Sequence, residues 1–176
     1  MISNKTVHIL RHFKVKDTLK QKLDSEEFSK WVELYDNTPL EYSDVELPDV
    51  DKVYVSSQNR AIKTAEYLGL DFERTDLLKE VETRPFLDTK RKFSKNFWLV
   101  IDRVLWFFNF KHKENRNDTT KRVHQFLEKI EDEESVLLVS HGFFIKVLIY
   151  ELEKLGYKGD KNFRAKNGKL YKFTKN

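Results

Sequence analysis

The sequence predicts an α/β fold whose central sheet is mostly parallel and flanked by helices. Three short apolar runs, at residues 7–10, 53–55 and 136–139, have the length and composition of parallel strands covered on both faces. The first and last of these runs end at histidines, His12 and His141. In open parallel sheets, ligands bind beyond the carboxyl ends of the strands. We therefore expect the two imidazoles to meet at one rim of the sheet.

The segment after the first strand predicts a helix and then an irregular stretch. Apolar residues recur at close to helical spacing over residues 28–35, which favours a helix. Two prolines bracket the acidic residues 41–51, and prolines at both ends of a polar stretch are typical of a loop. We expect this stretch to run over the surface.

A strand, a cap and a helix follow one another after this loop. The strand is predicted at residues 52–56, and Ser56 or Ser57 is expected to cap a helix over residues 59–68. Arg60 lies in the first turn of that helix. Free backbone N–H groups at a helix start attract anions, and an arginine adds a bidentate donor for phosphate. This unit therefore predicts part of a phosphate site.

Two segments in the middle of the chain have less regular patterns. Residues 77–81 predict a short extended segment, and one of the carboxylates Glu80 and Glu82 is expected to face the rim. Apolar side chains in residues 93–110, many of them aromatic, cover far more than one helical stripe. Their length and charges disfavour a membrane span. We expect core packing plus a cap over the pocket there, with an interaction surface as the alternative.

Two more helices are predicted in the last third of the chain. Asp118 or Thr119 is expected to cap a helix whose apolar stripe covers residues 123–130. After the strand that leads to His141, residues 143–155 predict another helix. The remaining histidines are expected to be structural or at the surface, and they are His8, His112 and His124.

The C-terminal residues 163–173 alternate about the pair Asn167-Gly168, which is a strong short-range signal for a β-hairpin. No internal repeat and no linker divides the sequence. Its 176 residues, of which 39% are hydrophobic, are enough for one domain with a substantial core. We expect a single domain over residues 1–176.

Composition narrows the function classes. The 33 basic residues exceed the 29 acidic ones only slightly, so the net charge is +4 and no nucleic acid partner is expected. Cysteine is absent, which excludes disulfides, thiolate catalysis and thiolate zinc sites. No secretory signal follows Met1. We expect a cytoplasmic protein that does not bind membranes; the sequence does not predict its oligomeric state.

Four motifs together carry a family resemblance. In order and spacing, residues 7–155 resemble the histidine phosphatase superfamily, also called the phosphoglycerate mutase-like family. The motifs are Leu10-Arg11-His12, residues 56–65 around Arg60, Leu78-Lys79-Glu80-Val81 and Val139-Ser140-His141-Gly142. Asp118 and Arg122-Val123 also resemble that family. The resemblance implies a three-layer α/β/α sandwich and a phosphatase that needs no metal and no cofactor.

The same resemblance implies a role for each site residue. His12 would be the nucleophile that forms a phosphohistidine, and Arg11, Arg60 and His141 would form a cationic clamp around the phosphoryl oxygens. Glu80 would protonate the leaving group and then activate water, with Glu82 as the alternative. In-line phosphoryl transfer needs these three functions: a nucleophile, stabilisation of the equatorial oxygens and a proton donor.

The sequence departs from the family pattern at two places. Phe13 follows the first histidine where the family usually has glycine, and it is expected to narrow the pocket. Thr83-Arg84 stands where a glycine is frequent, and Arg84 is expected to read an anionic substrate.

Three functions remain open at this stage. The first is hydrolysis of small phosphomonoesters. The second is removal of phosphate from phosphohistidine on a partner protein, and the third is a regulatory module that binds phosphate without turnover. A mutase is disfavoured because residues 13–17 lack the glycine and glutamate that follow the first histidine in mutases of this family. The substrate itself cannot be inferred from the motifs.

Overall fold

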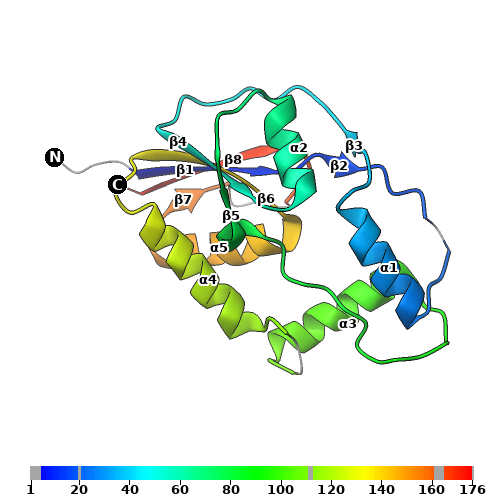
Figure 1. The fold of residues 1–176 in the computed structure, drawn as a ribbon. Coiled ribbons are helices and arrows are strands. Elements are labelled where there is room, and N and C mark those ends of the chain that lie inside the picture. Colours follow the sequence, from blue (N-terminus) through cyan, green and yellow to red (C-terminus); the bar gives the residue numbers. More distant parts are fainter. Residues whose placement is uncertain (1–4, 20, 111–112, 161–164, 176) are drawn as a thin grey trace.

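The computed structural model describes residues 5–19, 21–110, 113–160 and 165–175, and its centre is a mixed sheet (Figure 1). The strands of this sheet lie in the order β5-β4-β6-β1-β8-β7, and a second small sheet pairs β2 with β3. The strands are β1 (Lys5–Arg11), β2 (Lys14–Val15), β3 (Leu40–Glu41), β4 (Lys52–Ser56), β5 (Glu73–Thr75), β6 (Ser135–Ser140), β7 (Lys158–Gly159) and β8 (Leu170–Lys175). The helices are α1 (Ser25–Tyr35), α2 (Asn59–Tyr67), the 3-10 helix η1 (Asp76–Leu78), α3 (Lys95–Phe107), α4 (Arg116–Lys129) and α5 (Gly142–Lys154).

The strand pairing confirms a mostly parallel core. Strand β6 lies between β1 and β4 and is parallel to both, and β5 extends the parallel part beside β4. Strands β8 and β7 continue the sheet on the other side with antiparallel pairing. In the β1–β6 register Arg11 pairs with Ser140, so these two neighbouring strands end at the same rim.

The predicted C-terminal hairpin is only partly right. The turn at Asn167 and Gly168 exists, and Gly168 has a φ of 66°, which glycine adopts without steric cost. The antiparallel partner that precedes β8 is β7, however, and not the residues next to the turn. Ala165 and Lys166 belong to no strand, while residues 163–164 lie outside the described part of the chain.

Helices cover both faces of the sheet and make three layers. On one face, α2 packs its alanines and Ile62 on Val53, Val55, Leu137 and Val139, together with partly buried residues of the irregular segment 45–50. On the other face, α4 and α5 bury a larger cluster that includes Val123, Phe126, Phe144 and Leu148. The expected α/β/α sandwich is therefore confirmed.

Helices α1 and α3 stand to one side of the sandwich (Figure 1) and are called the cap below. Phe28 of α1 stacks on Trp98 of α3, with ring centroids 5.4 Å apart, inside a small aromatic cluster of its own. The aromatic segment at residues 93–110 thus packs through one face, as predicted. The opposite face is exposed at Phe97, Val100, Val104 and Phe107. None of the described helices combines the length and the apolar character that a membrane span requires.

Two predicted helix caps are wrong. Neither Ser56 nor Ser57 caps α2; the Asn59 N–H donates instead to the Asp36 carboxylate at 2.9 Å. Helix α4 begins before Asp118, because Asn115 caps it and Asp118 closes a reciprocal capping box three residues later. In both cases another side chain accepts the free backbone N–H groups: Asp36, which is distant in sequence, at α2, and Asn115 at α4.

The segment after β5 and the remaining histidines differ in how they match expectation. The segment predicted as extended over residues 77–81 includes the end of η1, and the backbone after Leu78 is irregular. His8 is buried and His124 is exposed, as expected for structural and surface positions, whereas His112 lies outside the described residues.

Candidate active site

His12 and His141 lie side by side at the rim. The His12 N–H donates to the Ser140 carbonyl at 3.0 Å, and the two ring centroids are 5.1 Å apart. His12 is 2% exposed and His141 is fully buried. The prediction that two strand ends bring these histidines together is therefore confirmed.

The environment of His12 fixes its tautomer and its charge. Nδ1 lies 2.7 Å from the Phe13 carbonyl oxygen. Because a carbonyl can only accept, Nδ1 carries the hydrogen and Nε2 keeps its lone pair. Burial first, and then the charges of Arg60 and Arg11, hold the pKa of His12 well below 6.5. His12 is thus a neutral imidazole with a free Nε2 at neutral pH.

His141 is held from the opposite side by Ser56. Its Nε2 lies 2.7 Å from the Ser56 hydroxyl, while its Nδ1 is buried and has no hydrogen-bond partner among the described residues. Burial first, and then the positive charge of Arg60, hold the pKa of His141 well below 6.5. The sequence predicted a cationic residue here. The ring is neutral in this environment, and an anion bound beside it would raise its pKa.

The guanidinium of Arg11 lies next to Gly142, the first residue of α5. Its Nη1 donates to the Ala165 carbonyl at 2.5 Å, and its Nε is buried without a hydrogen-bond partner in the described chain. A Cβ placed on Gly142 would lie 2.7 Å from Arg11 Cζ. The glycine of the Ser-His-Gly motif therefore leaves the room that this guanidinium needs. Burial lowers the pKa of Arg11 below its usual value.

Arg60 is aimed by residues from two segments. Its Nη1 is 2.7 Å from the Asp36 carboxylate, and its Nη2 donates to the Gln58 side-chain oxygen at 3.3 Å. Its guanidinium also lies over the Tyr35 ring, 5.6 Å from the centroid. Sequence reasoning missed Asp36 and Gln58. Gln58 lay inside a recognised motif, whereas Asp36 carried no local signal.

Three side-chain nitrogens at this rim are buried without a hydrogen-bond partner in the described chain: Arg11 Nε, Arg60 Nε and His141 Nδ1. Both arginine Nε groups are donors, and His141 Nδ1 is a donor when the Ser56 hydroxyl donates to Nε2. Leaving one buried donor unpaired costs about 1–3 kcal/mol, and more for a charged group. Three such groups around one nucleophilic histidine match an anion with several acceptor oxygens. This is the strongest structural sign of a phosphate site.

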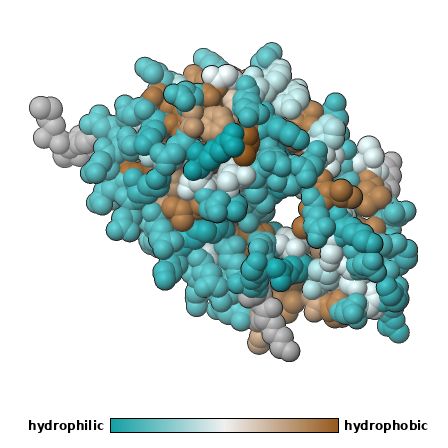
Figure 2. Space-filling view, in the orientation of Figure 1, coloured by the Kyte–Doolittle hydropathy of each residue, from teal (hydrophilic) through white to brown (hydrophobic). Residues whose placement is uncertain are grey.

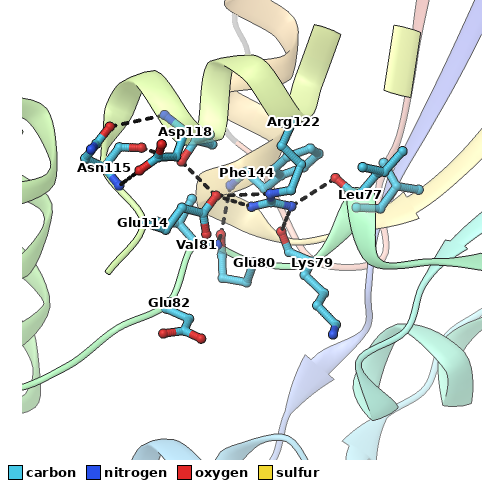
Figure 3. A network of polar contacts seen from close by, with 12 residues as sticks. Leu77, Lys79, Glu80, Val81, Glu82, Glu114, Asn115, Asp118, Arg122 and Phe144 are labelled. Atoms are coloured by element: carbon cyan, nitrogen blue, oxygen red, sulfur yellow. Dashed lines mark hydrogen bonds and ion pairs between the residues drawn. The ribbon is translucent and has the colours of Figure 1, made fainter. Parts of the chain in front are cut away.

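The two candidate acids occupy different surroundings. The Glu80 carboxylate accepts the N–H groups of Phe143 and Phe144 at the start of α5, at 3.0 and 2.8 Å. Glu82 also lines the cavity, but its side chain is exposed and forms ion pairs with Arg84 and Lys113. Figure 3 shows both carboxylates. Of the two carboxylates, Glu80 is the one held at the start of α5, beside the glycine that follows His141.

A network behind Glu80 holds its backbone (Figure 3). Nη1 of Arg122, in α4, donates to the carbonyls of Leu77 and Lys79 at 2.9 and 2.8 Å. The same guanidinium pairs with Glu114 at 2.6 Å and lies 4.5 Å from the ring centroid of Phe144. Arg122 thus connects Lys79, the residue before Glu80, to α4. The sequence indicated that Arg122 belongs to a helix resembling the family's, but it did not predict this hydrogen bond.

These residues open into a cavity of about 1090 Å³ between the sandwich and the cap. Figure 2 shows the hollow that separates the two. Arg11, His12, Arg60 and Glu80 line it from the sandwich side and, with His141, are called the floor below. The described residues contain no group of three or more His, Asp or Glu side chains placed to hold a metal ion.

Phe13 does not line this cavity, contrary to the expectation that it narrows the pocket. Phe13 is 1% exposed, and its ring makes edge contacts with the rings of Tyr42 and Tyr67. Its backbone N–H donates to the Thr64 hydroxyl at 3.0 Å. Arg84 does line the cavity, where it pairs with Glu82 at 3.2 Å.

The sequence matches the profile of a known family over most of its length. The profile of the histidine phosphatase superfamily (branch 1) matches residues 43–175, a range that contains Arg60, Glu80 and His141. The chain is 27% identical to human 6-phosphofructo-2-kinase/fructose-2,6-bisphosphatase 4 over 117 residues, which are 64% of this chain and 25% of the relative. A chicken 6-phosphofructo-2-kinase/fructose-2,6-bisphosphatase is 27% identical over 109 residues, 58% of this chain and 23% of the relative. The chain thus spans about a quarter of these relatives.

Solved structures share the fold at low sequence identity. A phosphoglycerate mutase from Bacillus anthracis has a TM-score of 0.56 and 18% identity, with 98% of this chain and 88% of that one covered. The alpha-ribazole phosphatase from Shigella flexneri has a TM-score of 0.54 and 16% identity, with 95% and 89% covered. A mycobacterial glucosyl-3-phosphoglycerate phosphatase has a TM-score of 0.55 and 17% identity, with 97% and 90% covered.

Proposed function

Because the chain belongs to the histidine phosphatase superfamily, we propose that it hydrolyses small phosphomonoesters through a phosphohistidine on His12, without a metal. One observation carries this proposal. A neutral, tautomer-locked His12 lies among three buried nitrogens of Arg11, Arg60 and His141 that have no hydrogen-bond partner in the described chain. That arrangement suits a nucleophile surrounded by groups that bind phosphoryl oxygens.

In the first step, the Nε2 lone pair of His12 attacks phosphorus while the bond from phosphorus to the ester oxygen breaks. Arg11, Arg60 and His141 donate hydrogen bonds to the three equatorial oxygens and stabilise the charge that spreads over them. Glu80, in its acid form, gives its proton to the departing oxygen. The products of this step are the alcohol and a phosphohistidine.

In the second step, water attacks the same phosphorus and the bond from phosphorus to Nε2 breaks. Glu80, now a carboxylate, takes a proton from the water, so that inorganic phosphate leaves and His12 regains its lone pair. Hydrogen bonding from Nδ1 to the Phe13 carbonyl keeps the ring in one tautomer through both steps. The chain's own cations supply the charge stabilisation in this scheme.

The test is to incubate the protein with p-nitrophenyl phosphate in EDTA, follow phosphate release, and quench at alkaline pH for mass spectrometry. We expect turnover and a phosphate adduct on His12 that acid removes and base does not. Loss of activity in EDTA with rescue by magnesium would contradict the metal-independent scheme. Tight phosphate binding without turnover would indicate the regulatory module instead.

A further inference from the structure

The cavity is larger than a phosphoryl group needs. Its volume of about 1090 Å³ matches or exceeds the range of about 300–1,000 Å³ that is typical of sites for drug-sized ligands. The floor accounts for one end of it. The other end belongs to the cap, which contributes Trp31, Tyr35 and Leu99 to the lining, while Phe143 contributes from the start of α5. The leaving group of the ester would therefore meet apolar side chains of the cap, beside polar ones such as Ser29, Glu33 and Arg103.

Trp31 is a rigid part of this wall. Its ring stacks on Phe28 at 5.5 Å and lies 5.1 Å from the Tyr35 ring. Phe28 in turn stacks on the buried Trp98. The indole is half-buried and lines the cavity, and Lys95 Nζ lies over its ring, 5.3 Å from the centroid, so part of the ring is already covered. An aromatic ring that is already held in place loses little side-chain freedom when a ligand packs on it.

The charges around the cavity disfavour a cationic leaving group. Asp36 and Glu82 pair with Arg60 and Arg84. Lys146 and Lys166 also line the cavity, and neither forms an ion pair with a described residue. Glu33 lines the cavity as well, but with six basic side chains against four acidic ones the lining as a whole is more positive than negative. A neutral or anionic ring is compatible with this surface.

From these observations we propose that the cap selects phosphomonoesters whose leaving group carries a flat aromatic ring, which packs against Trp31 and Leu99. This inference rests on the proposed function, because the phosphate must bind at the floor. Burial of an aromatic side chain or ring dominates the energetics of many contacts, and aromatic pairs favour stacked or edge-on geometry. Esters with short polyol leaving groups would leave this wall uncovered and bind less tightly.

The test compares two alkyl esters, 2-(1-naphthyl)ethyl phosphate and n-butyl phosphate. Both leaving groups are primary alcohols, so the demand for a proton is nearly equal and the ring is the main difference. We expect kcat/KM to be at least about tenfold higher for the naphthyl ester, corresponding to about 1.4 kcal/mol of selective binding. Trp31→Ala should reduce that ratio at least about fivefold, and Trp31→Phe should largely keep it.

A matched control variant lies on the other side of the cap. Phe97 is 40% exposed on α3 and does not line the cavity. Phe97→Ser should leave the ratio of the two esters as it is in the unaltered protein. Leu99→Ala, from the lining, provides a second variant if Trp31→Ala fails to fold, and it should also lower the ratio.

The possible outcomes separate this inference from the proposed function. Equal kcat/KM for the two esters, or an equal loss for both in Trp31→Ala, would overturn the aromatic wall while leaving a phosphatase. If the folded protein hydrolyses neither ester, the proposed function fails. Calorimetric titration of both esters then decides the inference, which requires tighter binding of the naphthyl ester and loss of that difference in Trp31→Ala.

Discussion

The floor and the cap are built in different ways. Floor residues stand at strand ends and helix starts of the sandwich, are mostly buried, and are held by backbone contacts such as those of His12. The cap has its own small aromatic cluster and is joined to its surroundings by contacts such as Trp98 Nε1 to the Leu23 carbonyl and Trp106 Nε1 to Thr119. In the proposed function, the floor carries out the phosphoryl transfer. The cap, which packs separately, contacts the leaving group and can select among leaving groups.

The largest effect should come from the nucleophile. His12→Ala should lower kcat/KM for p-nitrophenyl phosphate by about three orders of magnitude or more, because the covalent route is lost. The measurement is phosphate release, with circular dichroism to confirm folding. The cap variant Phe97→Ser serves as the matched control and should retain nearly full activity. Substantial activity in folded His12→Ala would show that His12 is not the nucleophile.

The proton donor comes next. Glu80→Gln should slow n-butyl phosphate about 100-fold or more but change p-nitrophenyl phosphate far less, because a good leaving group hardly needs a proton. Glu82→Gln is the control, since its exposed carboxylate pairs with Arg84 and Lys113. The opposite pattern, with Glu82→Gln alone sensitive to the leaving group, would show that the acid is two residues further on.

Arg122 tests whether the floor depends on positioning from behind. Arg122→Met removes the hydrogen bonds to the Leu77 and Lys79 carbonyls, and we expect about a tenfold fall in kcat for n-butyl phosphate with little change in KM. Urea titration should show a loss of about 1–3 kcal/mol, because two backbone carbonyls lose their donor and an ion pair is removed. Full kcat for n-butyl phosphate in folded Arg122→Met would make Arg122 purely structural.

The smallest effect concerns pH and stability. His12 and His141 have folded-state pKa values held well below 6.5 by burial and neighbouring arginines, so below pH 6.5 the unfolded chain binds more protons than the folded one. The contribution of these two rings to the free energy of unfolding is therefore fully present above pH 6.5. It is lost as the pH falls from 6.5 towards the folded-state pKa values. The slope approaches about 1.4 kcal/mol per pH unit for each ring.

Urea titrations at pH 7.5, 6.5 and 5.5 measure this slope, and the variant His12→Asn/His141→Asn provides the comparison. We expect a flatter dependence between pH 6.5 and 5.5 in the double variant, since asparagine does not titrate in this range. Trp31→Ala, which changes the cap and no titrating group, should keep the original slope. The same slope in all three proteins would mean that the two floor histidines are not the linked groups.

The sequence predicted the floor better than anything else because its signals are local. An apolar run that stops at a histidine is enough to predict where a strand ends. Because β1 and β6 are parallel and end together, they bring His12 and His141 to one rim. The caps and the hairpin failed for the opposite reason. Asp36 caps α2 from 23 residues away, and β8 finds its preceding partner in β7 rather than beside its own turn.

By itself, the sequence determined the α/β order of the elements, the motif residues of the floor and the family. Only the tertiary structure decided that Glu80 rather than Glu82 stands at the start of α5, that Phe13 turns away from the cavity, and that Trp31 lines it. The physical reason is that strand and helix patterns depend on neighbours in the chain, whereas orientation in a cavity depends on packing between segments that are distant in sequence.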